Sequence, residues 1–266
     1  MDKLGIIAGI DYLPVAVAQE AKKQGKEVVI ISLTAQRAIE LPSVGDKFYE
    51  INVGQLDQLI STLKQEGITQ AVMAGKVTKE LLFTNLVLDE RALRLLAALP
   101  DKNDDSILLG VVQELAKEGI TVLDQTTYLK HLLPQPGVLS QREPNPQEWL
   151  DIKYGQEMAK RVAGLDIGQT IVVKNQAILA VEAIEGTDAA IVRGGNLGRG
   201  GSIVIKVSKP QQDLRFDMPT VGLTTINSML QSNCSILAIE AGKTFLLHRE
   251  ELLQKANDSG IAIVAF

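Results

Sequence analysis

The stretch LGIIAGIDYLPVAVAQEAKKQGKEVVIISL (Leu4–Leu33) indicates the fold of the amino-terminal half. Its apolar run Leu4–Gly9 is typical of a buried strand, and a helical pattern follows, with a proline near its start and Gly25 at its end. The next apolar run, Glu27–Leu33, predicts a second strand. A strand, a helix and a strand in this order predict two parallel strands joined by a crossover helix.

The same alternation continues for another hundred or so residues. It predicts a helix over Gly54–Gly67 and a strand over Thr69–Lys76. Several helical stretches that end at Glu118 follow, and then a further strand over Ile120–Thr126. Strands that alternate with helices at this spacing favour a parallel sheet covered by helices. We therefore expect a Rossmann-like α/β domain over residues 1–133.

A proline-rich segment, residues 134–148, separates this domain from the rest. It holds four of the nine prolines, Pro134, Pro136, Pro144 and Pro146, and it lacks periodicity, which predicts a linker. The remainder, 149–266, predicts a distinct mixed α/β domain. It opens with a helix over Pro146–Ala163, continues with a hairpin through Asn175 and Gln176, and ends with further strands and helices near Thr224–Gln231 and Arg249–Ser259.

Composition excludes several classes of protein. The 266 residues carry a net charge of −5 and only 4% aromatic residues, which argues against nucleic-acid binding. Cys234 is the single cysteine, so an intrachain disulfide is excluded, and we expect a small buried residue rather than a nucleophile. The chain shows no signal peptide and no apolar run of the roughly 18–20 residues that span a bilayer. These features predict a soluble, cytoplasmic protein, with contact at a membrane surface left open.

Polar and glycine residues concentrate in the stretch Val181–Gly222. Its acidic residues are Glu182, Glu185, Asp188, Asp213 and Asp217, with Thr187, Gln212 and Thr220 beside them. Its basic residues are Arg193, Arg199, Lys206, Lys209 and Arg215. Carboxylates that can hold a divalent cation, next to cations that can hold phosphate, predict phosphoryl-group chemistry.

Three segments within this stretch have separate interpretations. EGTD (Glu185–Asp188) follows a strand and predicts the start of a turn or helix. RGGNLGRGG (Arg193–Gly201) has five glycines in nine residues, which favours a mobile flap over a ligand; a plain surface loop is the alternative. If KPQQDLRFDMP is extended, Asp213, Arg215 and Asp217 face one side, around a metal–phosphate group or as a structural ion-pair ladder. Glu240 is a further candidate partner of this group.

The amino-terminal half has two loops that suit ligand contact. Gly9–Leu13 follows the first strand, and Gly75 and Lys76 end a later one, where the crevice of a parallel sheet lies. A tight turn and a solvated lysine are the alternatives. Neither a dinucleotide fingerprint nor a P-loop is present, and the two histidines form no triad-like pattern, which disfavours a nicotinamide-dependent oxidoreductase and a serine hydrolase.

Taken in order, IIAGxxxLP, VMAGKV, DD before a helix, LDIGQ, VEAIEGTDA, KPxQDxRxDxPTVG and IEAGKT resemble the LpxI-type UDP-2,3-diacylglucosamine pyrophosphatases, from about Leu4 to Phe266. The resemblance implies a cytoplasmic, Mg²⁺-dependent enzyme of lipid A synthesis. It would cleave UDP-2,3-diacylglucosamine to UMP and 2,3-diacylglucosamine 1-phosphate. The resemblance also implies a homodimer, transient contact with the inner membrane and a catalytic carboxyl-terminal domain that, with the first, holds the lipid.

The resemblance carries over to individual positions. Catalysis and metal binding fall to Asp188, Asp213 and Asp217, with their division of roles open. The implied substrate-binding residues are Gly9, Leu13, Gly75, Lys76, Thr187, Lys206, Lys209, Gln212, Arg215 and Thr220. The chain departs from the family at Ile10 and Asp11, where the first loop is usually glycine-rich, and at Gln211. A non-catalytic nucleotide- or lipid-binding module is the alternative function.

Overall fold

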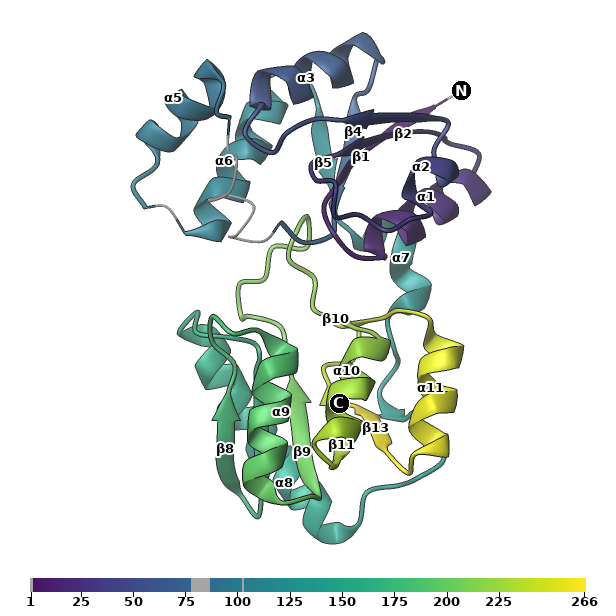
Figure 1. Cartoon of the computed structure of the whole chain (residues 1–266), viewed down its shortest axis with the longest axis vertical. Helices are drawn as coiled ribbons and strands as arrows, with labels where there is room; N and C mark the ends of the chain where they lie inside the picture. Colours follow the sequence, from purple (N-terminus) through teal and green to yellow (C-terminus); the bar gives the residue numbers. More distant parts are fainter. Residues whose placement is uncertain (1, 78–86, 102) are drawn as a thin grey trace. The chain divides into compact units, whose positions relative to one another are not determined.

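The computed structural model describes residues 2–77, 87–101 and 103–266 (Figure 1). The chain divides into two compact units, each with its own sheet. The first comprises Met1–Leu129 with Leu214–Phe216, and the second comprises Lys130–Asp213 with Asp217–Phe266. The sequence prediction of an α/β chain with a parallel sheet in its first half and a separate mixed sheet in its second is confirmed.

The first unit is built on a parallel sheet whose described strands lie in the order β3-β2-β1-β4-β5. Its strands are β1 (Lys3–Ala8), β2 (Glu27–Ser32), β3 (Lys47–Glu50), β4 (Gln70–Ala74) and β5 (Thr121–Leu123). Its described helices are α1 (Leu13–Lys23), α2 (Leu41–Val44), α3 (Leu56–Gln65), α5 (Glu90–Ala98), α6 (Asp104–Lys117) and α7 (Thr126–Leu129). Part of the predicted helical stretch before Glu118, residues 78–86, lies outside the described residues.

The central strands of this sheet are apolar because helices cover both of their faces. In β1 and β2, Ile6, Ile7, Ile30 and Ile31 are at most 2% exposed. A parallel strand buried on both faces reads as a continuous apolar run rather than as an alternation. This is why the runs at Leu4 and Glu27 could be recognised in the sequence.

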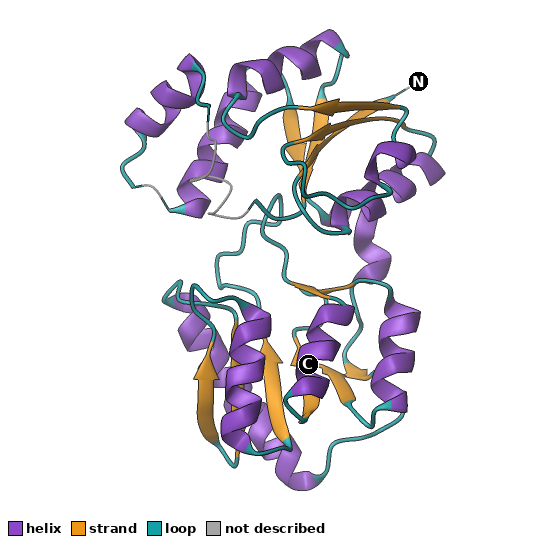
Figure 2. Ribbon diagram, in the orientation of Figure 1, coloured by secondary structure: helices purple, strands orange, loops and turns teal. Residues whose placement is uncertain are grey.

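The second unit holds a mixed sheet in the order β6-β13-β11-β9-β7-β8 (Figure 2). Strands β13, β11 and β9 are parallel, whereas β6, β7 and β8 join antiparallel. The strands are β6 (Gly137–Val138), β7 (Thr170–Lys174), β8 (Ala177–Val181), β9 (Ser202–Lys206), β11 (Cys234–Ile239) and β13 (Ala262–Ala265), with a separate pair β10 (Thr220–Val221) and β12 (Phe245–Leu246). The helices are a 3-10 turn (Lys130–Leu132), α8 (Pro146–Gly164), α9 (Thr187–Gly198), α10 (Leu223–Gln231) and α11 (Arg249–Asp258).

Helices cover both faces of this second sheet. Alternate residues of a strand point to opposite faces, so Ile171 and Val173 of β7 belong to an apolar cluster with α8, whereas Val172 belongs to one that includes residues of α9, α10 and α11. Two separate apolar clusters result, one on each side of the sheet. The unit is therefore a three-layer α/β/α sandwich.

Part of the proline-rich segment 134–148 is built into the second unit. Val138 and Gly137 of β6 pair with the last strand, β13, and the carbonyl of Pro134 accepts a hydrogen bond from Gly242 N at 3.0 Å. At the end of the segment, Asn145 and Glu148 form a reciprocal capping box that starts α8. Between Pro134 and α8, therefore, the chain is held by backbone pairing and by a helix cap.

The glycine-rich segment Arg193–Gly201 is largely helical, so the prediction of a flap is wrong. Helix α9 runs through Gly198, and the chain reverses only at Arg199, which has φ 53°. A Cβ on Gly194 would lie 2.5 Å from Val172 Cβ, and one on Gly195 would lie 2.6 Å from Ser232 Oγ. These glycines let the helix lie close to its neighbours, which is the physical reason for their number.

The predicted hairpin through Asn175 and Gln176 is confirmed. Strands β7 and β8 pair antiparallel, and the two turn residues have φ 50° and φ 56°. The buried carboxylate of Asp151, in α8, accepts from both turn amides at 2.8 Å. This side chain from another element therefore stabilises a turn whose left-handed backbone ordinarily favours glycine.

Candidate active site

Several of the predicted site residues gather at the carboxyl end of β9. This strand ends at Lys206, beside the parallel strand β11, and the loop 207–219 begins there. Helix α9 begins nearby at Thr187, whose hydroxyl accepts a hydrogen bond from Lys206 Nζ at 3.0 Å. In open α/β sheets, ligands bind outside the carboxyl ends of the strands, so the placement suits a binding site.

The amino terminus of α9 has the charge distribution of an anion site. Lys206 is only 7% exposed, and Thr187 donates its hydroxyl proton to Glu182 Oε1 at 2.8 Å. The residue before the helix, Gly186, has φ 82° and supplies no capping side chain. The first backbone N–H groups and the positive end of the helix dipole therefore lie next to a buried ammonium, an arrangement that favours phosphate.

Gln169, in the connection between α8 and β7, joins this helix terminus to the loop 207–219. Its backbone N–H donates to Glu182 Oε2 at 3.3 Å, and its side-chain amide donates to Asp217 Oδ2 at 3.4 Å. A Cβ on the preceding Gly168 would lie 2.1 Å from the carbonyl oxygen of Glu182, so only glycine permits this approach. Among the described side chains, Gln169 Oε1 is buried without a hydrogen-bond partner.

The loop 207–219 is curled rather than extended, so the condition under which residues 213, 215 and 217 would share one face of a strand is not met. The N–H of Asp217 donates to the carbonyl of Asp213 at 3.1 Å, which closes a turn of helical spacing. The Gln212 amide donates to the carboxylate and to the carbonyl of Asp217, and Gln212 Oε1 accepts from Lys209 N at 2.7 Å. These side-chain bonds to backbone favour a turn over a strand.

Lys209 places a second cation beside the Asp217 carboxylate. Its Nζ lies 3.5 Å from Asp217 Oδ2 and 2.7 Å from Asp166 Oδ1. The side chain of Lys209 is 20% exposed and that of Asp217 is 35% exposed, so both are accessible to a ligand. The described contacts thus bring together Thr187, Lys206, Lys209, Gln212 and Asp217 of the predicted residues.

The remaining predicted residues of this region lie around the cluster or outside it. Asp188 is exposed in the first turn of α9, and Asp213 is half-buried. Thr220 donates its hydroxyl proton to the carbonyl of Met218 at 3.1 Å. Arg215 belongs to the first unit, and its guanidinium lies 6.0 Å from the ring centroid of Phe216.

The two predicted glycines of the first unit are explained by backbone packing. A Cβ on Gly9 would lie 2.3 Å from the carbonyl oxygen of Lys76, and Gly75, with φ 84°, would meet the carbonyl oxygen of Ile10 at 2.4 Å. The N–H of Leu13 donates to Asp11 Oδ1 at 2.8 Å, at the start of α1. A close approach of two loops therefore accounts for both glycines, and ligand contact at these positions stays a prediction.

The described acidic side chains do not form a preformed metal cage. In the part of the chain that the structure describes, no group of three or more His, Cys, Asp or Glu side chains could hold a metal ion. Magnesium, however, is usually bound through one or two carboxylates together with substrate phosphates. Asp217, with Asp213 four residues earlier in the same turn, fits that smaller requirement.

Sequence reasoning missed three polar residues of this region. Gln169 and Asp166 lie in the LDIGQ segment, whose polar residues between a helix and a strand are the signal that could have found them. Lys160, in the carboxyl-terminal part of α8, contacts Ser208 and Glu240, and its position in the sequence gives no such signal. Glu182 was named among the acidic residues of Val181–Gly222, but the sequence assigned it no role in the site.

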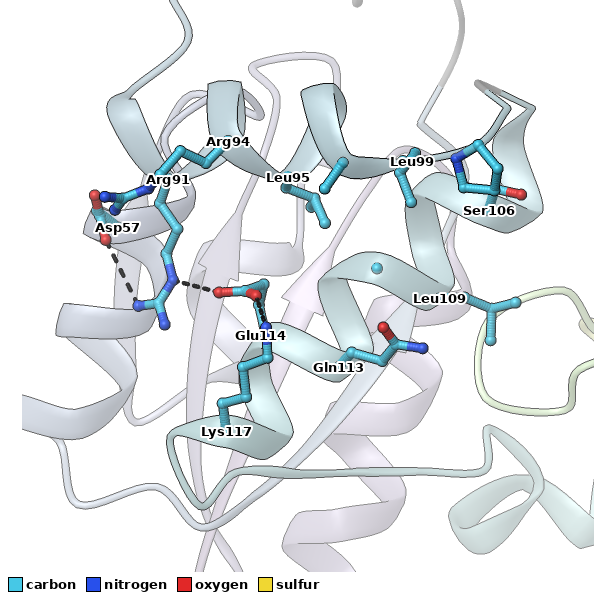
Figure 3. A pocket seen from close by; sticks show the side chains of 13 residues that line it. Asp57, Arg91, Arg94, Leu95, Leu99, Ser106, Leu109, Gln113, Glu114 and Lys117 are labelled. Carbon is cyan, nitrogen blue, oxygen red and sulfur yellow. Dashed lines mark hydrogen bonds and ion pairs between the residues drawn. The ribbon is translucent and has the colours of Figure 1, made fainter.

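A pocket of about 810 Å³ lies elsewhere, in the first unit, against α5 and α6 (Figure 3). Leu95, Leu99 and Leu109 line it together with charged side chains. Those charges pair with one another, because Glu114 contacts both Arg91 and Lys117. None of the residues that the sequence assigned to the site is among those described as lining this pocket.

Comparison with known proteins places the whole chain in one family. Residues 3–132 match the LpxI N-terminal domain, and residues 135–264 match the LpxI C-terminal domain. The chain is 31% identical to the UDP-2,3-diacylglucosamine pyrophosphatase LpxI of Caulobacter vibrioides, and the match covers 99% of this chain and 97% of the relative.

Solved structures give a much weaker likeness. The N5-carboxyaminoimidazole ribonucleotide synthetase from Thermotoga maritima has 15% identity and a TM-score of 0.28, covering 68% of this chain and 41% of that one. The glycinamide-RNase-transformylase T from Mycobacterium tuberculosis has 12% identity and a TM-score of 0.26, covering 68% and 44%. The chain thus spans less than half the length of either protein. The identification rests on the two domain matches and the Caulobacter relative: this chain belongs to the LpxI family.

Proposed function

We propose that this protein hydrolyses the diphosphate of UDP-2,3-diacylglucosamine and releases UMP and 2,3-diacylglucosamine 1-phosphate. The name of the Caulobacter relative supports this substrate. The observation that carries the proposal is the hydrogen-bonded cluster at the carboxyl end of β9. There Gln169 donates hydrogen bonds to Glu182 and to Asp217 of KPQQDLRFDMP. Glu182 in turn accepts from Thr187 of the EGTD segment, so Gln169 connects the two segments.

Phosphate oxygens would be held at the amino terminus of α9. The backbone N–H groups of the first turn lie there with the ammonium of Lys206, which donates to the Thr187 hydroxyl and is held in place by it. Lys209 adds a second cation on the side of Asp217. Such preorganised donors stabilise negative charge that develops on the phosphoryl oxygens during attack.

Asp217 is the proposed base that orients the attacking water. Its carboxylate accepts hydrogen bonds from the amides of Gln212 and Gln169, which fix its direction. The unpartnered Oε1 of Gln169 would accept a proton of the same water, which accounts for an otherwise unsatisfied buried oxygen. A carboxylate within hydrogen-bond reach of water is the geometry that general-base catalysis needs.

Magnesium is the proposed cofactor, which Asp217 and Asp213 would hold together with substrate phosphate oxygens and water. When bound, it would neutralise charge on the diphosphate. Lys206 and Lys209 would then bind the phosphate oxygens that the metal leaves uncovered. Asp188, exposed one residue after Thr187, is the further candidate for either role.

The protein is also proposed to act as a homodimer in the cytoplasm, at the inner membrane, where a diacylated substrate would lie. No helix in the described part of the chain is long and apolar enough to cross a membrane. Light scattering would measure the oligomeric state, and flotation with vesicles would measure membrane contact.

The test of the proposed function is release of UMP from UDP-2,3-diacylglucosamine by the purified chain, with and without EDTA. We expect one UMP per lipid product, and loss of turnover on chelation that added Mg²⁺ restores. Binding of the substrate without UMP release would instead identify a non-catalytic binding module. Turnover that EDTA leaves unchanged would contradict the assignment of magnesium alone.

A further inference from the structure

Glu240 is a buried carboxylate directly behind the loop that carries Asp217. It follows β11, whose last residue Ile239 is paired with Lys206 of β9, so Glu240 lies level with the first residues of the loop. The residue is 9% exposed. A buried carboxylate is costly unless hydrogen bonds and opposite charges compensate it, so its partners show what it holds.

One oxygen of Glu240 accepts three hydrogen bonds at the base of the loop. Oε2 accepts from Ser208 N at 3.0 Å, from Ser208 Oγ at 2.8 Å and from Lys160 Nζ. Lys160 Nζ also donates to the carbonyl of Ser208 at 3.0 Å. The Lys160–Glu240 ion pair therefore fixes the N–H, the carbonyl and the hydroxyl of Ser208. The other oxygen, Oε1, contacts the exposed Lys243 at 2.9 Å.

The fixed residue begins a chain of contacts that leads to the proposed base. Ser208 is bonded to Lys209, whose backbone N–H donates to Gln212 Oε1 at 2.7 Å. The amide of Gln212 in turn donates to the carboxylate of Asp217. A rotation of the peptide between Ser208 and Lys209 would therefore move the amide that directs Asp217.

We propose that Glu240 is a positioning residue, which holds Ser208 so that the loop presents the Asp217 carboxylate in a reactive orientation. This inference rests on the hydrolysis proposed above. Apolar residues of equal volume would often give the same stability as a buried ion pair or more, so stability alone does not explain why this pair is present, whereas its contacts with Ser208 point to orientation. Misplacement of a catalytic group by about 1 Å can cost roughly 100-fold in rate.

The test is the Glu240→Gln variant, which keeps the size of the side chain and removes the charge that Lys160 pairs with. We expect kcat for UMP release to fall about 10- to 100-fold, with KM changed less than about threefold, because the lost interaction acts on the transition state. Amide hydrogen exchange of a peptide covering residues 207–219 should become faster. The matched control is Lys243→Ala, which removes a contact to the other oxygen of the same carboxylate and should leave both readouts unchanged.

Each outcome of this experiment decides the proposal. A Glu240→Gln protein with wild-type kcat overturns it, and so does a loss of kcat with unchanged exchange at 207–219. If Glu240→Gln does not fold, Ser208→Ala, which removes only the hydroxyl, should show the same two changes at smaller size, and wild-type values there overturn the proposal. If the wild-type chain releases no UMP, the proposed function fails, and the exchange measurement still decides whether Glu240 fixes the loop.

Discussion

Replacing Gly194 with alanine tests whether the glycines of α9 serve packing or mobility. The added Cβ would lie 2.5 Å from Val172 Cβ and 2.9 Å from Ala180 Cβ. Both neighbours are buried strand residues, and their Cβ atoms cannot rotate away. Overpacking of this kind costs about 1–3 kcal/mol, and these contacts argue for the upper part of that range. The higher helix propensity of alanine returns about 1 kcal/mol, which leaves a net loss of about 1–2 kcal/mol.

Thermal unfolding of the second unit, followed by calorimetry, measures this loss as a lower Tm of about 2–8 °C. The matched control is Gly164→Ala, because Gly164 is also helical and the nearest atom to its added Cβ, Pro210 Cγ, is 3.7 Å away. With open space, that variant should gain up to about 1 kcal/mol from helix propensity. A Gly194→Ala protein as stable as the wild type would refute the packing argument and support a loose segment.

Three further predictions concern the second unit. Asp151→Ala should lower the free energy of unfolding by about 3 kcal/mol, because it removes the carboxylate that accepts from Asn175 N and Gln176 N. An unchanged midpoint of urea denaturation would contradict this prediction. Thr187→Ala should lower kcat/KM about 10-fold or more, because the hydroxyl that bridges Lys206 and Glu182 is lost. Thr187→Ser keeps this hydroxyl and should keep most of the activity. Equal kcat/KM values for the two variants would show that the hydroxyl is not needed. Burial alone would raise the pKa of Glu240, but hydrogen bonds from Lys160, Ser208 and Lys243 outweigh it and lower the pKa to about 2. Because the folded pKa lies below the unfolded value, the carboxylate stabilises the fold above about pH 4.5, and this contribution, up to about 3 kcal/mol, is lost as pH falls towards 2. Glu240→Gln should flatten this part of the acid-unfolding curve, and an unaltered curve would contradict the assignment.

The parallel sheet could be predicted because its signal is local. Buried central strands such as β1 and β2 appear as apolar runs, and each crossover helix has its own start and stop residues. The hairpin through Asn175 and Gln176 was found for the same reason. The prediction that Cys234 is a small buried residue is also confirmed, since it is 3% exposed and burial raises the pKa of its thiol.

The errors arose where distant partners decide the local conformation. Glycines in a loop and glycines at a helix–sheet contact look alike in sequence, and only the approach of Val172 to Gly194 distinguishes them. The alternating charges of the loop 207–219 suit an extended segment as well as a turn, and only the hydrogen bonds of the Gln212 amide and the Asp213 carbonyl with Asp217 show that the loop is curled. Lys160 escaped notice because its partners Ser208 and Glu240 are 48 and 80 residues away.

UMP release by Asp217→Asn, measured beside the wild type, tests the central claim most directly. The introduced asparagine keeps the size of the side chain, but its amide cannot act as a base. Its NH₂ group also adds a donor at a position towards which Gln169 and Gln212 already donate. We predict a loss of kcat of at least about 100-fold with the thermal unfolding of the protein preserved. A folded Asp217→Asn protein that releases UMP at the wild-type rate would contradict the account.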